Sequence, residues 1–299
     1  MNAYNNLHRW SEKKPKKIFS ALKLLSRLIM FAASRDWTRR LVRLAFKLFK
    51  INRDIAVRSG DGVIYANSVD RLAAALLWKH SLLSGFESEI YKSAVKKGAT
   101  VLEIGANIGF FTTLFAKLAG ESGKVVAFEP DPDNFRLLEK NIQANDCKNA
   151  VCVQKAVSDR TGTGRLYLCE EHRGDHRLFD SRDGRRSVEV ETAAIDDFMP
   201  GGAVVNFIKM DIQGAEYLAL QGMERTIKNS GHLLMLCEFS PALLRRAGTD
   251  PLEFLKKLEA LGFTLKYLDE EKKSAVPAGT AELLGKCEGE DYLNLYLEK

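Results

Sequence analysis

A regular alternation of apolar runs and amphipathic segments, which begins near residue 100, constrains the fold of this chain more than any other feature. The apolar runs are rich in Val, Ile and Leu at consecutive positions, which is typical of strands buried on both faces of a parallel sheet. They span residues 101–105, 124–130, 150–159, 165–170, 187–195, 204–211, 232–239, 263–269 and 291–299. Helical patterns separate them at residues 110–118, 132–145, 215–229 and 252–261. We therefore predict an α/β domain with a doubly wound, mostly parallel sheet and an antiparallel closing pair.

The first part of the chain has a different character, because it is strongly basic. Residues 1–60 contain 15 Lys and Arg residues against 3 acidic ones, although the net charge of the whole chain is only +6. Residues 18–50 show the i, i+3, i+4 spacing of an amphipathic helix. We predict a basic amphipathic helical extension over residues 1–54, followed by the α/β domain over residues 55–299.

Two interpretations fit the basic helical segment. Its charged face is suited to an anionic membrane surface, which leaves open a peripheral membrane contact through residues 18–50. A helical lid, or an arm that joins two subunits of a homo-oligomer, explains the same pattern with a solvated basic face. The rest of the chain carries more acidic than basic residues, so we expect no nucleic-acid partner.

Cysteine usage and hydropathy indicate a compartment. The five cysteines are odd in number and form no C-x-x-C pair, which argues against a disulfide framework or a zinc site and fits reduced thiols. No apolar run reaches the roughly 18–20 residues that span a bilayer, and charges recur throughout the first fifty residues, unlike a signal peptide. We expect a cytoplasmic protein, at the inner face of the membrane if the basic segment binds lipid.

Two glycines follow the first strand of the alternating region, in the stretch VLEIGANIGF. Gly105 permits a tight turn with close backbone approach, and Gly109 lets the next helix pack closely. Dinucleotide sites use G-x-G-x-x-G around a pyrophosphate, whereas here Asn107 stands in a G-x-N-x-G pattern. A sulfonium with an amino-acid tail suits this loop better, and Glu103 supplies a nearby anion. The pattern thus favours S-adenosylmethionine, although glycine turns after strands also occur for structural reasons alone.

Acidic residues follow the next two strands. Glu129 ends the second strand, 24 residues beyond Gly105, where a carboxylate can accept hydrogen bonds from both ribose hydroxyls. Asp159 follows the third strand, where an adenine ring would lie, but its surroundings also fit an ordinary turn. We predict that both residues bind the cofactor.

Three further carboxyl groups follow the fourth and fifth of the strands that we expect in the sheet. Asp211 is predicted to face the reacting methyl group, where it acts as a general base on a hydroxyl or orients the ammonium group of the cofactor. Glu216 opens the next helix, where it contacts substrate or only complements the helix dipole. Glu238 is expected beside Asp211, and the pair could hold a divalent cation. We favour substrate or cofactor binding there without a metal.

The segment from His172 to Arg177 is unusually rich in charged and titratable groups. His176 could take a hydroxyl proton near neutral pH. Asp175 and Arg177 are predicted substrate ligands, with Arg177 suited to an acidic or sugar substrate. Zinc binding by the two histidines would need helical spacing, which Gly174 disfavours. A polar surface turn explains the same residues.

These residues resemble the FkbM family of methyltransferases over about residues 85–270. The matching blocks are VLEIGANIGFFT, VVAFEPDPDNFRLLEKNI, KAVSD, VEVETAAIDDF, FIKMDIQGAEYLALQGM and LLMLCEFS. The resemblance implies a seven-stranded class I methyltransferase sheet of Rossmann-like topology, with S-adenosylmethionine as donor. It implies that Glu103, Gly105, Asn107 and Gly109 form the donor loop, that Glu129 binds the ribose, and that Asp211 lies at the reaction centre. The chain departs from the family at residues 174–177, where many members have a Gly-x-x-Ser segment.

We therefore expect an S-adenosylmethionine-dependent O-methyltransferase. The family is associated with methylation of natural products, sugars and cell-envelope glycans, so the partner is expected to be a small-molecule or glycan acceptor. One alternative is an NAD(P)-dependent oxidoreductase, against which the absence of G-x-G-x-x-G counts. Another is a non-catalytic, membrane-associated binding module on the same Rossmann-like sheet.

Overall fold

The computed structural model describes residues 54–59, 62–67, 86–170, 172–287, 289 and 291–299. The predicted basic extension, with its amphipathic helix over residues 18–50, lies outside the described residues. The first helix among the described residues is α5 (Phe86–Ala94). No helix in the described part of the chain is long and apolar enough to cross a membrane.

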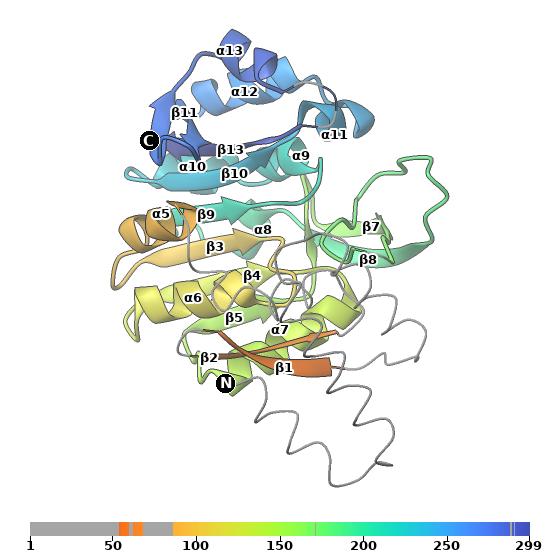
Figure 1. Cartoon of the computed structure of the whole chain (residues 1–299), viewed down its shortest axis with the longest axis vertical. Helices are drawn as coiled ribbons and strands as arrows, with labels where there is room; N and C mark the ends of the chain where they lie inside the picture. Colours follow the sequence, from red (N-terminus) through yellow and green to blue (C-terminus); the bar gives the residue numbers. More distant parts are fainter. Residues whose placement is uncertain (1–53, 60–61, 68–85, 171, 288, 290) are drawn as a thin grey trace, which may run out of the picture. The chain divides into compact units, whose positions relative to one another are not determined.

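The main sheet contains eight strands (Figure 1). In order from one edge to the other they are β12 (Ser274–Pro277), β11 (Thr264–Asp269), β13 (Leu293–Glu298), β10 (Leu234–Phe239), β9 (Phe207–Met210), β3 (Thr100–Ile104), β4 (Lys124–Phe128) and β5 (Ala150–Val153). The strands from β10 to β5 are parallel, whereas β13 is antiparallel to both of its neighbours. The α/β prediction is confirmed, and the sheet is mixed. The expected count of seven strands is wrong, because the four-residue β12 adds an antiparallel hairpin partner to β11.

Chain order reverses beside β3. The chain runs outward from β3 to β4 and β5, and it then returns to β9 on the other side of β3. Such a switch point opens a crevice at the carboxyl ends of the strands. The site is therefore expected above β3, β4 and β9.

Helices cover both faces of the sheet, since successive residues of a strand point to opposite sides. On one face, Val101 packs with α5 and α6 (Phe110–Ala119), and α7 (Pro132–Ala144) lies on the same side. On the other face, Leu102 and Ile104 belong to a larger core with the C-terminal helices. These are α9 (Glu216–Gln221), α10 (Glu224–Asn229), α11 (Pro241–Arg246), α12 (Pro251–Ala260) and α13 (Thr280–Gly285), preceded in the chain by the short α8 (Ile195–Phe198).

A second, three-stranded sheet lies beyond the carboxyl ends of the parallel strands (Figure 1). It consists of β6 (Ala156–Val157), β8 (Ser187–Ala193) and β7 (Gly162–Tyr167). The strand expected at residues 150–159 is therefore divided: β5 belongs to the main sheet and β6 to the small one. Residues 165–170 and 187–195, predicted as strands of the main pattern, instead belong largely to β7 and β8 of the small sheet.

The helix expected over residues 215–229 is also divided, into α9 and α10. Gly222 separates the two, and a Cβ there would come 2.0 Å from the backbone oxygen of Ser158. The backbone amide of Asp196 donates to the oxygen of Gly222 at 2.8 Å. Close contact with the small sheet therefore overrides the helical pattern at this point.

β1 (Asp54–Ser59) and β2 (Gly62–Asn67) pair antiparallel as a hairpin. Side chains of α7 hold it in place. Asn141 accepts from the amide of Tyr65 at 2.6 Å and donates to the oxygens of Tyr65 and Ile108 at 2.9 and 2.7 Å. Arg136 forms a two-pronged ion pair with Asp54. Asn141 thus joins the hairpin to the loop between β3 and α6.

Replacing Asn141 with Ala removes all three hydrogen bonds and leaves buried backbone groups without partners. We expect the variant to lose about 2–4 kcal/mol of unfolding free energy, measured by urea denaturation. Gln143→Ala is the matched control, because Gln143 is exposed on the same helix and its loss should cost less than about 0.5 kcal/mol. Equal losses in the two variants would contradict the role assigned to Asn141.

Candidate functional site

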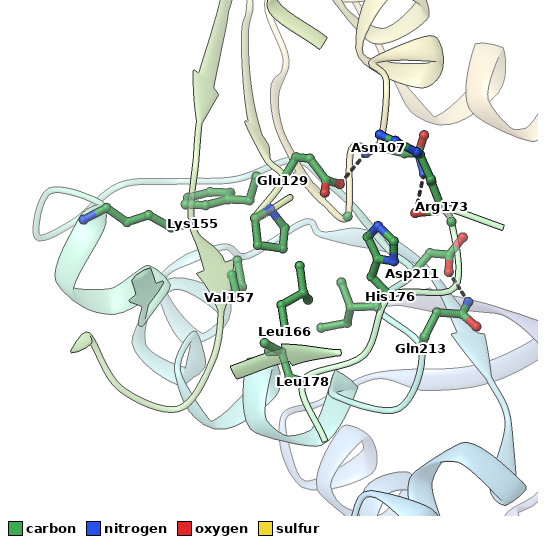
Figure 2. A pocket seen from close by; sticks show the side chains of 16 residues that line it. Asn107, Glu129, Lys155, Val157, Leu166, Arg173, His176, Leu178, Asp211 and Gln213 are labelled. Atoms are coloured by element: carbon green, nitrogen blue, oxygen red, sulfur yellow. Dashed lines mark hydrogen bonds between the residues drawn. The ribbon is translucent and has the colours of Figure 1, made fainter. Parts of the chain in front are cut away.

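A cavity of about 640 Å³, counting the solvent at its mouth, lies at the predicted switch point (Figure 2). We call it the first cavity. Its lining comes from the loop after β3, the ends of β4 and β9, the start of β6, and the segment around residues 173–178. The lining residues are Gly105, Asn107, Phe128, Glu129, Pro130, Lys155, Ala156, Val157, Leu166, Arg173, Gly174, His176, Leu178, Asp211, Ile212 and Gln213.

The glycine loop has the geometry that its sequence predicts. Gly105 has a φ of 87°, and a Cβ on it would come 2.2 Å from the backbone oxygen of Asp211. Gly109 has a φ of 78°, and a Cβ there would come 2.5 Å from Leu138 of α7. The predicted tight turn and close helix packing are confirmed. Asn107 also has a positive φ, 52°, which an Asn tolerates better than most residues.

Glu129 joins this loop to the end of β4. Its carboxylate accepts from the amides of Asn107 and Asp131 at 2.8 and 2.9 Å. The side chain is buried, with 5% of its surface exposed, yet it lines the first cavity. Burial raises the pKa of Glu129 to about 7, against the lowering effect of its backbone hydrogen bonds. A carboxylate has about four acceptor positions, so Glu129 retains capacity for a ligand.

Three residues predicted to bind the cofactor, Glu103, Gly109 and Asp159, are not among those that line the first cavity. Glu103 is fully buried under α6, where its Oε2 accepts from the hydroxyl of Thr112 at 2.6 Å. Its Oε1 has no hydrogen-bond partner, and burial raises its pKa to about 7. Asp159 accepts from the hydroxyl of Ser158 at 2.9 Å, in the turn that follows β6.

Asp211 lies at the tip of β9 and lines the first cavity, with 39% of its side chain exposed. Gln213 donates from Nε2 to both Asp211 and Glu238, at 2.8 and 2.9 Å. The expected juxtaposition of Asp211 and Glu238 on neighbouring strand tips is therefore present. Burial and the nearby Asp211 charge raise the pKa of Glu238 to about 8.

Lys209, which lies in β9, adds a positive charge beside Asp211 and Glu238. Its Nζ lies 3.5 Å from Asp211 Oδ2 and 5.1 Å from the ring centre of Phe111. The side chain is 8% exposed, and Lys209 is the register partner of Glu103 on β3. Burial opposes its charge, but the surrounding carboxylates raise the pKa of Lys209 above its ordinary value.

Glu216 forms hydrogen bonds with the loop after β9 and does not line the first cavity. It is 3% exposed, and it accepts from the amides of Ile212 and Gly214, the latter at 2.9 Å. Burial raises its pKa to about 7. Of the two interpretations of Glu216, these contacts favour the structural one, in which a carboxylate satisfies free amides at a helix start.

The segment rich in charged groups forms one wall of the first cavity. His176 lines it, and its Nδ1 accepts from the amide of Cys169 at 3.0 Å. Asp175 is held in ion pairs with Arg177 and Arg185, at 2.8 and 2.7 Å. Neither Asp175 nor Arg177 is among the lining residues, whereas Arg173 and Gly174 are. Arg173 also contributes its backbone oxygen, which accepts from the side chains of the glycine loop and α7.

Sequence reasoning assigned no role to Lys209, Gln213, Lys155 or Arg173. A signal existed for the first two, since both flank Asp211 at a strand tip. Within the described residues, no group of three or more His, Cys, Asp and Glu side chains is arranged to hold a metal ion.

The strand order and the cavity define the class of protein. Without β12, the order is that of the class I methyltransferase fold, with a ligand crevice at the switch point. The family model of the methyltransferase FkbM domain matches residues 103–265, more than half of the chain. The chain therefore belongs to the FkbM methyltransferase family, and it is an S-adenosylmethionine-dependent methyltransferase. This membership selects methyl transfer over the alternatives of hydride transfer and of binding alone.

Several known proteins are similar to this chain. Methyltransferase 1 of Beauveria bassiana (strain ARSEF 2860) is 25% identical over 186 residues, which are 55% of this chain and 73% of that protein. Hexuronic acid methyltransferase AglP of Haloferax volcanii is 26% identical over 160 residues, which are 52% of this chain and 59% of that protein. The crystal structure of methyltransferase FkbM from Methylobacillus flagellatus KT aligns at 14% identity with a TM-score of 0.42, over 71% of this chain and 50% of that one.

The residues of the first cavity fit the methyl donor. Gly105 leaves a cradle that any Cβ would fill, and Glu129 offers a buried carboxylate beside it. In the view of Figure 2, the apolar side chains of Val157, Leu166 and Leu178 lie across the cavity from Asp211. An apolar slot of this kind suits a flat base. When bound, S-adenosylmethionine supplies an electrophilic methyl group on a sulfonium.

Replacing Gly105 with Ala is expected to cost about 3 kcal/mol of stability, through its positive φ and the collision with Asp211. S-Adenosylhomocysteine should bind at least about tenfold more weakly, measured by titration calorimetry. Gly184→Ala is the matched control, because Gly184 has a φ of 76° but no atom within 4 Å of the position that a Cβ would take. That variant should lose only about 1 kcal/mol and keep its affinity. Equal effects would show that the contact with Asp211 is unimportant.

Proposed function

We propose that the protein transfers the methyl group of S-adenosylmethionine to a hydroxyl oxygen of a small molecule or glycan. The observation that carries this proposal is the carboxylate of Asp211, which is partly exposed at the edge of the first cavity. A neutral hydroxyl must lose its proton as it attacks, so the reaction benefits from a base at this position. A similar protein of Haloferax volcanii is named as a methyltransferase of hexuronic acid, which supports a sugar-like acceptor.

In this proposal, Asp211 would accept the hydroxyl proton as the oxygen attacks the methyl carbon in line, and the bond from that carbon to the donor sulfur would break to leave S-adenosylhomocysteine. Gln213 and Lys209 fix the position of the Asp211 side chain from two directions. Most of the rate enhancement comes from this positioning, which holds both reactants at attack distance. His176 remains a candidate base, but its Nδ1 already accepts a backbone hydrogen bond. The geometry therefore favours Asp211.

The other residues predicted to bind donor or acceptor have direct or indirect roles in the proposal. Glu129 accepts hydrogen bonds from the donor ribose, and the loop from Gly105 to Gly109 encloses the donor tail. Glu103 acts on the donor only through space, and Asp159 would need to turn to reach the adenine. Arg177 and Asp175 shape the wall of the first cavity through their mutual ion pair.

Asp211→Asn tests the proposed base. We expect kcat to fall about 100-fold or more, because the amide cannot take a proton. The affinity for S-adenosylhomocysteine should change little, since the side chain keeps its shape. Transfer of labelled methyl and titration calorimetry measure the two effects. His176→Ala is assayed in parallel: a large loss of kcat there, with Asp211→Asn unaffected, would reverse the assignment.

The raised pKa of Glu129 predicts that the affinity for the donor depends on pH. Its pKa of about 7 means that the carboxyl keeps its proton below neutral pH and accepts fewer hydrogen bonds from the ribose. The affinity for S-adenosylhomocysteine should therefore rise about tenfold from pH 6 to pH 8 and then level off. Glu129→Gln should bind more weakly and show a flat profile.

Glu103→Gln separates two explanations of that profile. Glu103 has the same raised pKa of about 7 but does not line the first cavity. We expect Glu103→Gln to retain the rise in affinity between pH 6 and pH 8. If this variant flattens the profile and Glu129→Gln does not, then Glu103 is the group that senses the donor.

A further inference from the structure

A second cavity adjoins the first one at Asp211, which lines both. It has a volume of about 500 Å³, counting the solvent at its mouth, and it lies between α5, the tips of β9 and β10, and the start of β13. Its polar lining residues are Glu87, Lys209, Asp211, Glu238, Tyr292 and Asn294. The predicted base therefore stands at the boundary between two cavities, one of which fits the methyl donor.

The polar groups of the second cavity converge from different elements. Glu87 comes from α5, where it accepts from the hydroxyl of Tyr91 at 2.5 Å. Glu238 comes from β10, and Asn294 is its register partner on β13. Carboxyl and amide groups that approach from several sides can each bind one or two hydroxyls of a polyol. Glu238, whose pKa burial raises to about 8, can also donate a hydrogen bond at neutral pH.

Tyr292 adds an aromatic surface to this polar set. It is 58% exposed, more than any other large hydrophobic side chain of the described residues. A tyrosine at the rim of a cavity offers an apolar ring face and a polar tip. The face of the tyrosine ring can pack against the C–H face of a sugar ring, while the hydroxyls of the sugar form hydrogen bonds with the polar groups of the cavity.

The charge of the second cavity limits what it can accept. Among the described lining residues, Lys209 is the one basic side chain, and it is buried and paired with Asp211 at 3.5 Å. Three carboxyl groups, from Glu87, Asp211 and Glu238, share the lining. An anionic group placed here would meet the carboxylates of Glu87 and Asp211 without an available cation, and like charges at close range repel each other.

We propose that the second cavity binds the methyl acceptor, and that the acceptor presents a neutral polyhydroxylated ring rather than a carboxylated or phosphorylated one. This inference rests on the proposed function and gives it a substrate class. It separates this chain from its Haloferax volcanii relative, which is named for a hexuronic acid. A hydroxyl held in the second cavity reaches Asp211 on one side and the donor on the other.

The first experiment measures binding without catalysis. The full-length protein is saturated with S-adenosylhomocysteine and probed by saturation-transfer NMR with methyl glycosides of neutral hexoses and of the matching hexuronates. We expect a neutral glycoside to bind at least about tenfold more tightly than its uronate. Preferential binding of uronates overturns the inference, and so does the failure of every neutral glycoside to bind.

The second experiment assigns the cavity. Tyr292→Ala should raise the KM for the acceptor about tenfold, with kcat and the affinity for S-adenosylhomocysteine nearly unchanged. Tyr292→Phe should restore the KM. Val204→Ala is the control, because Val204 is 51% exposed and lines neither cavity. An unchanged KM in Tyr292→Ala overturns the cavity assignment and leaves the proposed function intact. Glycosides that bind the cavity but receive no methyl group would instead contradict the proposed function.

Discussion

The contact between Gly105 and the backbone oxygen of Asp211 is the constraint on which the site depends. It fixes the loop after β3 against the tip of β9, and the amide of Asp211 donates to the oxygen of Ile104 at 3.1 Å. Only a residue without Cβ permits this approach. Because the loop is held there, the Asn107 amide can reach Glu129 on the next strand. One close backbone contact therefore aligns the glycine loop, the carboxylate of Glu129 and the carboxylate of Asp211.

A buried set of charges lies beneath this surface. Glu103 and Lys209 are register partners on β3 and β9, and the Nζ of Lys209 lies 3.5 Å from Asp211 Oδ2. Burying such groups costs free energy unless they are paired, and a hydrophobic replacement is often at least as stable. Their presence at a strand tip beside two cavities is thus better explained by chemistry than by folding. Gln213 joins Glu238 to this set through its hydrogen bonds. The four titratable side chains thus form one connected group, which consists of Glu103, Lys209, Asp211 and Glu238.

Much of the fold follows from the sequence, because strands buried on both faces and turn glycines leave strong local patterns. The positions of Gly105, Glu129 and Asp211 follow too, since carboxyl ends of parallel strands meet at one edge. The direction of a side chain is harder to predict. Glu103 alternates with Leu102 and Ile104 and so faces α6, but nothing local says which face the cavity is on. The ion pair of Asp175 with Arg185 and the break at Gly222 arise from distant contacts that local patterns do not contain.

The two cavities also give a physical reason for the placement of Asp211. As the oxygen of the proposed hydroxyl acceptor bonds to the methyl carbon, its proton becomes more acidic, and a carboxylate beside it can take that proton. An anionic acceptor would weaken this arrangement, because its charge would repel the carboxylate of Asp211. Burial raises the pKa of Glu238 to about 8, so Glu238 can hold its proton while Asp211 takes one. Two neighbouring carboxyl groups in different environments can thus acquire different roles, and the proposed neutral hydroxyl acceptor would use both.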